Sequence, residues 1–200
     1  MTQNPLAGDW SRWRDKVDLD EYETRWQRMA ADGQNPHGEV DFVMRYEPAS
    51  VLDAGCGMGR VAIELARRGV DTVGVDLDVD LLERARQAAP HLAWLHANLA
   101  ELDINRRFDV VVLAGNIPLF IEATERAAAI ANCGRFVAVG GYMISGFQLR
   151  TQGPHLADYD QWCALAGLTL TERFATWDGD PYDNGGYAVS VHYRHRVTAD

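Results

Sequence analysis

The sequence predicts an α/β fold, a doubly wound sheet of seven strands that is mixed in direction and finishes with a terminal antiparallel strand pair. Strand-like apolar runs alternate with helical patterns between residues 50 and 141, and such alternation builds a parallel sheet. Two further β-like runs follow near the end of the chain. A glycine-rich segment, VLDAGCGMG at 51–59, continues directly from the first apolar run, which is where open α/β sheets bind ligands.

A chain of 200 residues with 47% hydrophobic content can close one sizeable core. We therefore expect a single domain over residues 1–200. Within it, residues 1–47 form a helical segment that could act as a lid, and residues 48–200 form the core sheet with its helices. The opening MTQNPLAGDW lacks the start of a secretory signal, and no run of about 18 apolar residues occurs. These features predict a cytoplasmic protein with no membrane partner.

Charge and cysteine usage narrow the classes of partner. The formal net charge of −10 works against binding a phosphate backbone, because that binding rests largely on cationic side chains. We expect no nucleic-acid partner and favour a small molecule or a protein as substrate. The three cysteines are far apart with no CxxC pair, and the histidines show no ligand-like spacing. We therefore expect neither a disulfide framework nor a metal site.

Helical patterns are expected ahead of the sheet. Residues 10–31 place tryptophans and other apolar side chains among charges in a loosely helical pattern that stops near Gly33 and Pro36. The segment HGEVDFVMRY at 37–46 predicts a second, short helix that ends before Pro48.

The core elements then alternate in the order that a parallel sheet requires. The fourth strand, FDVVVLAGN, is apolar enough to be buried on both faces. Gly69 closes the first core helix, while Asp80 with Glu83 caps the second, which Pro90 terminates. In chain order the expected elements are strand 50–55, helix 60–69, strand 71–76, helix 81–89, strand 92–99, strand 108–116, helix 125–134 and strand 135–141.

The end of the chain predicts the antiparallel pair. Residues 168–177 and 187–194 are both β-like, and the second run places Tyr, Val, Val and Tyr at alternate positions, the period of a strand. The segment DGDPYDNGG between them is rich in turn residues and suits a hairpin-like connection.

The glycine-rich turn indicates a ligand site. Gly55, Gly57 and Gly59 would let the backbone bend sharply and approach a ligand, with amides at the start of the next helix directed at it. The structural alternative is a tight turn that needs glycine only for its dihedral angles. Asp76 ends the second strand, 21 positions after Gly55 (76 − 55), and could accept hydrogen bonds from both hydroxyls of a ribose. A carboxylate there serves a dinucleotide as well as other nucleoside cofactors. The dinucleotide fingerprint G-x-G-x-x-G fits imperfectly, because Arg60 stands where its last glycine belongs.

These motifs together resemble the class I S-adenosylmethionine-dependent methyltransferases. The resemblance rests on the D-x-G-x-G-x-G that begins at Asp53, the VGVD that ends at Asp76, HANL after the third strand and FDVVVLAGN as the fourth. It covers residues 48–141 strongly and, through the terminal strand pair, nearly the whole chain. It implies a Rossmann-like fold, S-adenosyl-L-methionine as the cofactor and methyl transfer as the activity.

The resemblance also implies roles for individual residues. It places Gly55, Cys56 and Gly57 against the methionine part of the cofactor, with Asp53 steadying the turn and reaching the amino group. In the same way it implies that Asp76 holds the ribose. The full set of expected cofactor-binding residues is Asp53, Gly55, Cys56, Gly57, Asp76, Leu77, Asn98, Leu99, Gly115 and Asn116.

The adenine end of the expected site departs from the family. The resemblance places Leu77 beside the adenine ring. Asn98, followed by Leu99, stands where the family often has an aspartate that contacts the adenine amino group. An asparagine carbonyl can still accept that hydrogen bond, but without the assistance of a charge.

The acceptor is expected beside AGNIPLF at 114–120. This segment resembles the Asn-Pro-Pro-aromatic motif of amino-group methyltransferases, but it departs from that motif because Ile117 separates Asn116 from Pro118, so it does not by itself predict a nitrogen acceptor. We expect Asn116 to line the pocket near the sulfonium group of the cofactor. His37 is the candidate general base by its position ahead of the core sheet, with a helix cap or a surface histidine as the alternative. Cys56 is not interpreted as a nucleophile, because no histidine can be placed beside it.

The expected function is therefore transfer of a methyl group from S-adenosylmethionine to an unidentified small-molecule acceptor. Two alternatives stay open at this point. An NAD(P)-dependent oxidoreductase would share the sheet and Asp76. A non-catalytic S-adenosylmethionine-binding protein would keep the cofactor without an acceptor pocket.

Overall fold

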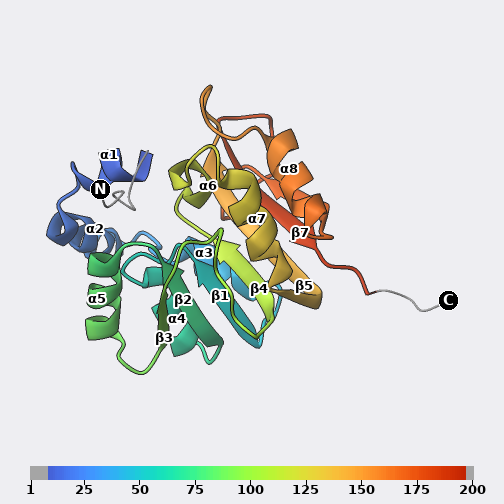
Figure 1. Cartoon of the computed structure of the whole chain (residues 1–200). Coiled ribbons are helices and arrows are strands. Elements are labelled where there is room, and N and C mark those ends of the chain that lie inside the picture. The colour runs from blue at the N-terminus through green and yellow to red at the C-terminus, as the bar shows by residue number, and fades with distance from the viewer. Residues whose placement is uncertain (1–8, 197–200) are drawn as a thin grey trace, which may run out of the picture.

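The computed structural model describes residues 9–196, which form one mixed sheet with helices on both faces (Figure 1). The expected seven strands are all present. They are β1 (Ser50–Ala54), β2 (Asp71–Asp76), β3 (Ala93–His96), β4 (Phe108–Leu113), β5 (Val137–Gln148), β6 (Thr169–Phe174) and β7 (Tyr187–Tyr193). The helices are α1 (Asp9–Arg14), α2 (Leu19–Ala31), α3 (Gly38–Met44), α4 (Arg60–Arg67), α5 (Val79–Ala88), α6 (Ile117–Phe120), α7 (Arg126–Arg135) and α8 (Leu156–Leu165).

The sheet has the strand order β3-β2-β1-β4-β5-β7-β6. The first five of these strands run parallel to one another, whereas β7 lies antiparallel to both β5 and β6. This arrangement confirms the predicted fold class. β1 pairs with β2 on one side and with β4 on the other. The connections that follow β1 and β4 therefore lead away in opposite directions, and a crevice opens between them at the carboxyl ends of the strands.

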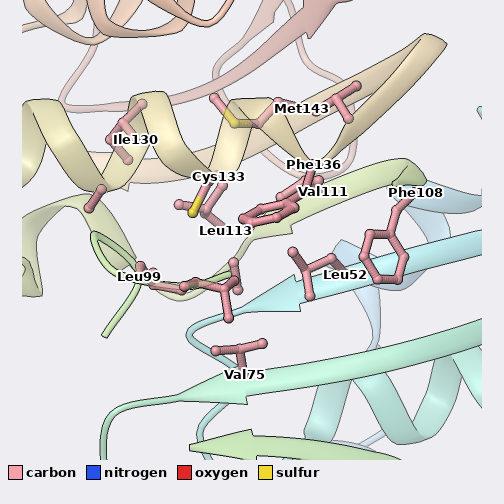
Figure 2. Packing of buried hydrophobic residues seen from close by; sticks show 14 of the residues in the cluster. Leu52, Val75, Leu99, Phe108, Val111, Leu113, Ile130, Cys133, Phe136 and Met143 are labelled. Carbon is pink, nitrogen blue, oxygen red and sulfur yellow. The ribbon is translucent and has the colours of Figure 1, made fainter. Parts of the chain in front are cut away.

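The core lies on both faces of the sheet, which explains the unbroken apolar run of β4. Val111 and Leu113 pack toward α7, where Ile130 and Cys133 meet them (Figure 2). Val110 and Val112 face the other way and pack with side chains of α3 and α4. Because successive side chains of a strand point to opposite faces, the stretch Val110–Leu113, which is covered on both sides, is apolar throughout, whereas Asp109 at the half-buried start of β4 accepts hydrogen bonds from Ser50.

The N-terminal helical pattern divides into two helices rather than one. The Asp18 carboxylate accepts hydrogen bonds from the backbone N–H groups of Asp20 and Glu21, at 2.9 and 3.1 Å. These contacts satisfy the free N–H groups at the start of α2. The sequence signal was an aspartate followed three residues later by a glutamate, which is typical of a helix start.

The cap of α5 is Asp78, not the predicted Asp80. The Asp78 side chain accepts hydrogen bonds from the N–H groups of Asp80 and Leu81, and its own backbone is extended. The helix therefore begins at Val79. Aspartates alternate at 76, 78 and 80, so the sequence offered several residues able to cap a helix.

β5 is longer than expected because its glycines form a bulge and do not end the strand. Phe108 of β4 pairs with Val137, and Val110 pairs with Tyr142, so two steps along β4 match five along β5. Gly140 has a φ of +83° within this irregular stretch. Glycine supplies that conformation without strain, after which pairing resumes to Gln148.

The sequence did not predict α6 and α8. α6 spans four residues, too few for a helical period to be visible. α8 buries Tyr159 and Cys163 but leaves Leu165 71% exposed, so its apolar residues do not mark one face. α8 covers the face of β7 opposite α3, which is why Ser190 and His192 are buried as well as Val189 and Val191.

Within residues 9–196 no helix combines the length and the apolar character that crossing a bilayer would require.

Candidate functional site

The glycine turn joins β1 to α4 and needs glycine for two separate reasons. Gly55, Gly57 and Gly59 all have positive φ, at +83°, +54° and +84°. A methyl group at Gly55 would overlap the side chain of Ile117, and one at Gly59 would overlap the indole of Trp94. Gly59 is therefore required for the packing of a tight turn against β3, which is the structural explanation of a glycine-rich turn. Gly55, in contrast, lies at the wall of a cavity.

Asp76 holds the turn from the end of β2. Its Oδ2 accepts a hydrogen bond of 2.7 Å from the N–H of Gly57, and its Oδ1 accepts one of 2.9 Å from the N–H of Asp78. Burial raises the pKa of Asp76 above its usual range. Each oxygen keeps a second lone pair for a ligand hydroxyl.

Asp53 ties the end of β1 to α4. Its Oδ2 accepts a hydrogen bond of 3.1 Å from the N–H of Ala62, and only 1% of the residue is exposed. Burial raises the pKa of Asp53 to about 7, against the partial opposing effects of that hydrogen bond and of Arg60. A carboxyl group with this pKa lies between its charged and neutral forms near neutral pH.

Two cavities lie at the carboxyl ends of β1, β2 and β4. The larger has a volume of about 280 Å³ and the smaller about 100 Å³. They are contiguous because they share five lining residues, which are Trp10, Gly55, Asp76, Ile117 and Phe120. Together they form a single groove, called here the switch-point groove, with Asp76 at its middle.

The larger cavity contains the glycine turn and a cation. Asp53, Gly55, Cys56, Gly57 and Gly115 line it, as do Met58, Arg60, Val61, Ile63, Leu81, Arg84, Ala88, Ala114 and Trp26. The guanidinium of Arg60 lies 4.0 Å from the centre of the Trp26 ring and pairs with the carboxylate of Glu39. Arg60 and Asp53 thus give this cavity one cationic and one acidic side chain. Such a pair suits the amino-acid part of a ligand, which carries both an ammonium and a carboxylate group.

Cys56 is unsuited to nucleophilic chemistry. Burial and the neighbouring carboxylates of Asp53 and Asp76 raise its pKa well above the usual value. Its Sγ lies 3.7 Å from the carbonyl oxygen of Gly57, to which it donates. The thiolate is the reactive form of cysteine, so the geometry agrees with the sequence interpretation of Cys56 as a lining residue.

The smaller cavity is apolar on its walls and acidic at its edge. Leu77, Leu99, Ile117 and Ile121 form the walls, while Asn98, Glu122 and Glu125 supply polar groups. The Oδ1 of Asn98 accepts a hydrogen bond of 2.9 Å from the N–H of Ala100, and its Nδ2 donates one of 3.2 Å to Glu125. This shape suits a flat aromatic ring with a hydrogen-bonding edge.

The N-terminal helices lie over the groove. The Trp10 ring meets Phe120 edge to face, with centroids 5.2 Å apart. Arg14 donates hydrogen bonds to Asp78, at 3.0 Å, and to Asp80, at 3.1 Å. Trp10 and Trp26 from α1 and α2 thus line cavities that the core strands open.

Asn116 and His37 are the predicted site residues that lie outside the lining of both cavities. Asn116 has a φ of +68°. Its Oδ1 accepts a hydrogen bond of 2.8 Å from the N–H of Gln148, so it joins the end of β4 to the end of β5. His37 precedes α3, and its Nδ1 is shielded from solvent with no hydrogen-bond partner among the described residues.

Several lining residues carry no signal in the sequence. Ile117 and Phe120 lie in the AGNIPLF segment, which sequence analysis assigned to the acceptor, yet both also border the smaller cavity. Glu122 and Glu125 precede α7 and have only the pattern of a helix start. Their approach to Asn98 depends on the packing of the segment after β4 against the end of β3.

Comparisons with known proteins agree with this geometry. The family described as "Methyltransferase domain" matches residues 51–141. An uncharacterized methyltransferase of Mycobacterium tuberculosis (strain ATCC 25618 / H37Rv) is 41% identical over 106 residues, which are 51% of this chain and 52% of that protein. The crystal structure of a TehB-like SAM-dependent methyltransferase from Corynebacterium glutamicum is similar over 88% of this chain and 97% of that one, with 33% identity and a TM-score of 0.79.

A further relative is named for its substrate. The dTDP-3-amino-3,4,6-trideoxy-alpha-D-glucopyranose N,N-dimethyltransferase of Streptomyces venezuelae is 27% identical over 99 residues, which are 49% of this chain and 42% of that protein. The matched segments span about half the length or less of these curated relatives.

Proposed function

Since this chain belongs to the class I S-adenosylmethionine-dependent methyltransferases, we propose that it binds S-adenosylmethionine in the switch-point groove and methylates a small-molecule acceptor. S-adenosylmethionine is the methyl donor of this family, as in the similar SAM-dependent methyltransferase from Corynebacterium glutamicum. The groove itself is the observation that carries the proposal. It joins a cavity suited to an amino acid with a cavity suited to a flat ring, and it places a buried carboxylate where a ribose would lie between them.

The polar and charged groups that line the groove suit this cofactor along its whole length. Asp76 accepts from the ribose hydroxyls with the lone pairs that Gly57 and Asp78 leave open. Gly55 and Gly57 allow the methionine part to lie against the backbone. Asp53 and Arg60 provide opposite charges for the amino and carboxylate groups. When bound, S-adenosylmethionine supplies an electrophilic methyl group.

The remaining work of the protein is alignment and the exclusion of water. Holding an acceptor in line with the methyl group can supply about 7–11 kcal/mol of the barrier lowering. Gly115, at the end of β4, borders the larger cavity, and Asn116 holds that loop through Gln148. We propose that α1 and α2 act as the lid that covers the groove, because Trp10 and Trp26 already line it.

An acceptor that loses a proton needs a base, and we propose His37 for this role. Its Nδ1 is buried and unpartnered among the described residues. Because His37 does not line either cavity, the role requires the residues before α3 to turn toward the groove. A pH–rate profile that the His37→Ala substitution leaves unchanged would exclude it.

The small-molecule class of the acceptor and a cytoplasmic location belong to the same proposal. The relative from Streptomyces venezuelae is named for methylating a nucleotide-linked amino sugar, which supports a small acceptor. Cys56, Cys133 and Cys163 are all free thiols, and free thiols are typical of reducing compartments.

The first test is calorimetric titration of the protein with S-adenosylmethionine, S-adenosylhomocysteine and the nicotinamide dinucleotides. We expect micromolar dissociation constants, about −8 kcal/mol, for the first two ligands only. The Asp76→Asn substitution keeps an acceptor for the Gly57 N–H but removes the charge, so it should weaken binding by about 10- to 100-fold. Asp71→Asn, at the exposed start of the same strand, is the matched control and should bind as the wild type does.

Three outcomes would contradict the proposal. Binding of a dinucleotide alone would restore the oxidoreductase alternative. Unchanged affinity of the Asp76→Asn variant would show that the ribose lies elsewhere. Cofactor binding with no turnover of any acceptor would leave the non-catalytic binding protein as the better description.

A further inference from the structure

The smaller cavity of the switch-point groove contains a buried carboxylate oxygen with no hydrogen-bond partner among the described residues. Glu122 is half-buried and lines the smaller cavity. Its Oε1 is shielded from solvent and has no hydrogen-bond partner within residues 9–196. Leaving a buried acceptor unpaired is unfavourable, so the Oε1 of Glu122 is suited to accept from a donor other than the described residues.

The backbone fixes Glu122 at that edge. Its carbonyl oxygen accepts hydrogen bonds from the N–H groups of Glu125 and Arg126, at 2.9 and 3.0 Å, in the turn that starts α7. Arg126 in turn donates to the carbonyl of Ile121, at 3.1 Å. The side chain therefore leaves a well-held turn next to the cavity wall formed by Ile121.

The neighbouring polar groups are already engaged. Asn98 accepts from the N–H of Ala100 through Oδ1, and of the two polar atoms of an amide only the oxygen can accept, which fixes the orientation of the Asn98 side chain. Its Nδ2 donates to Glu125, an exposed residue. Asn98 therefore presents a donor toward the acidic edge, whereas the Oε1 of Glu122 is an acceptor with no hydrogen-bond partner among the described residues.

On the basis of the function proposed above, we propose that Glu122 recognises the exocyclic amino group of adenine and makes this site specific for a 6-amino purine. An amino group carries two N–H donors and satisfies the unpaired Oε1. A 6-oxo purine presents an acceptor at the same position, and two acceptors facing each other cannot form a hydrogen bond. Glu122 thus supplies the charge that Asn98 lacks, from a segment more than twenty residues further along the chain.

The test compares two product-like ligands that differ only at this position. S-adenosylhomocysteine carries the 6-amino group, and S-inosylhomocysteine carries a 6-oxo group. Titration of the wild type with each should give a preference for the adenine ligand of about 10- to 100-fold, because a hydrogen bond to a charged group discriminates by that amount. The readout is a ratio of dissociation constants and requires no acceptor.

Glu122→Gln is the informative variant, and Glu125→Gln is its matched control. A glutamine amide can rotate to donate to the 6-oxo group, so Glu122→Gln should reduce the preference to within about threefold. Glu125 also borders the smaller cavity, but its carboxylate already accepts a hydrogen bond from Asn98, so the preference should persist in Glu125→Gln. Far-UV circular dichroism of both variants checks that they fold.

The outcomes separate this inference from the function on which it rests. If the wild type binds the adenine ligand but Glu122→Gln keeps the full preference, the role of Glu122 is overturned while the cofactor assignment stands. If only Glu125→Gln loses the preference, Glu125 is the recognising residue and Glu122 is not. If the wild type binds neither ligand, the proposed function fails, and the role of Glu122 fails with it.

Discussion

A buried negative charge at Asp53 lowers the stability of the fold but favours the binding of a cationic ligand group. It ends β1 inside the protein, and its burial raises its pKa to about 7, well above the ordinary value of 3.8. At higher pH the folded protein must hold an uncompensated charge in a buried position. The same charge is what a cationic amino group of a ligand would meet, so the residue is suited to binding rather than to stability.

This carboxyl group predicts a pH dependence of stability in the ligand-free protein. Between about pH 4 and pH 7 the folded state keeps a proton that the unfolded state has lost, so the free energy of unfolding falls as pH rises through this window. Asp53→Asn removes the titration and should be more stable than the wild type at pH 8, by up to about 4 kcal/mol. Urea denaturation at pH 4, 6 and 8 measures this.

The control is again the exposed Asp71, where Asp71→Asn should change stability by less than about 0.5 kcal/mol at each pH. A wild type whose unfolding free energy does not decrease between pH 4 and pH 7 would contradict the raised pKa. So would an Asp53→Asn variant that is less stable than the wild type at pH 8.

At the scale of elements, α1 and α2 are attached to the core mainly by side chains. Arg14 joins α1 to Asp78 and Asp80 at the start of α5, and Arg84 of α5 joins Asp20 of α2. The Arg14 and Asp78 side chains are 23% and 3% exposed, so this pair is partly shielded from solvent. Contacts of this kind hold a segment in place while still allowing it to open.

The lid that we propose from α1 and α2 predicts a kinetic effect of substituting Arg14. Arg14→Ala should raise the dissociation rate of S-adenosylhomocysteine by about 5- to 20-fold, because a partly shielded hydrogen-bonded ion pair contributes about 1–2 kcal/mol. Stopped-flow measurement of dissociation gives the rate directly. The midpoint of urea unfolding should change little, because α1 adds little to the core.

Arg106→Ala provides the comparison. Arg106 pairs with Asp71 at the start of β2, which is the end of that strand away from the groove. It should leave the dissociation rate unchanged. An Arg14→Ala variant with wild-type dissociation would mean that α1 and α2 do not retain the ligand.

At the scale of the whole molecule, the two faces of the sheet share their strands. β1 contributes Leu52 to the cluster under α7 and Val51 to the cluster under α3 and α4. β4 divides its side chains in the same way. Loss of either cluster would therefore expose the strands that support the other, which favours cooperative unfolding of one domain.

We accordingly predict a single thermal transition. Far-UV circular dichroism and tryptophan fluorescence should give coincident curves, and S-adenosylhomocysteine at 100 times its dissociation constant should stabilise the fold by about 2.7 kcal/mol. For a chain of this size that corresponds to a rise in Tm of about 5–10 °C. Two separated transitions would contradict the single-domain prediction.

Local patterns in the sequence were enough to predict the order in which strands and helices follow one another along the core of the chain. Local signals suffice for this, because apolar runs, glycine turns and capping residues each act within a few positions of the chain. They predicted the mixed sheet, the terminal antiparallel pair and a ligand site at the glycine turn. They misplaced details wherever several residues could do the same local job, as with Asp78 and Asp80 at the start of α5.

Contacts between residues far apart in the chain became visible only in the folded molecule. Glu122 and Asn98 border the same cavity, Asn116 accepts a hydrogen bond from the N–H of Gln148, and the Trp10 ring contacts the Phe120 ring. The fold also extends β5 through a pair of glycines that resemble a strand end. The physical reason is that side-chain contacts between elements depend on how the elements pack, and no period or motif within one segment specifies the partner on another.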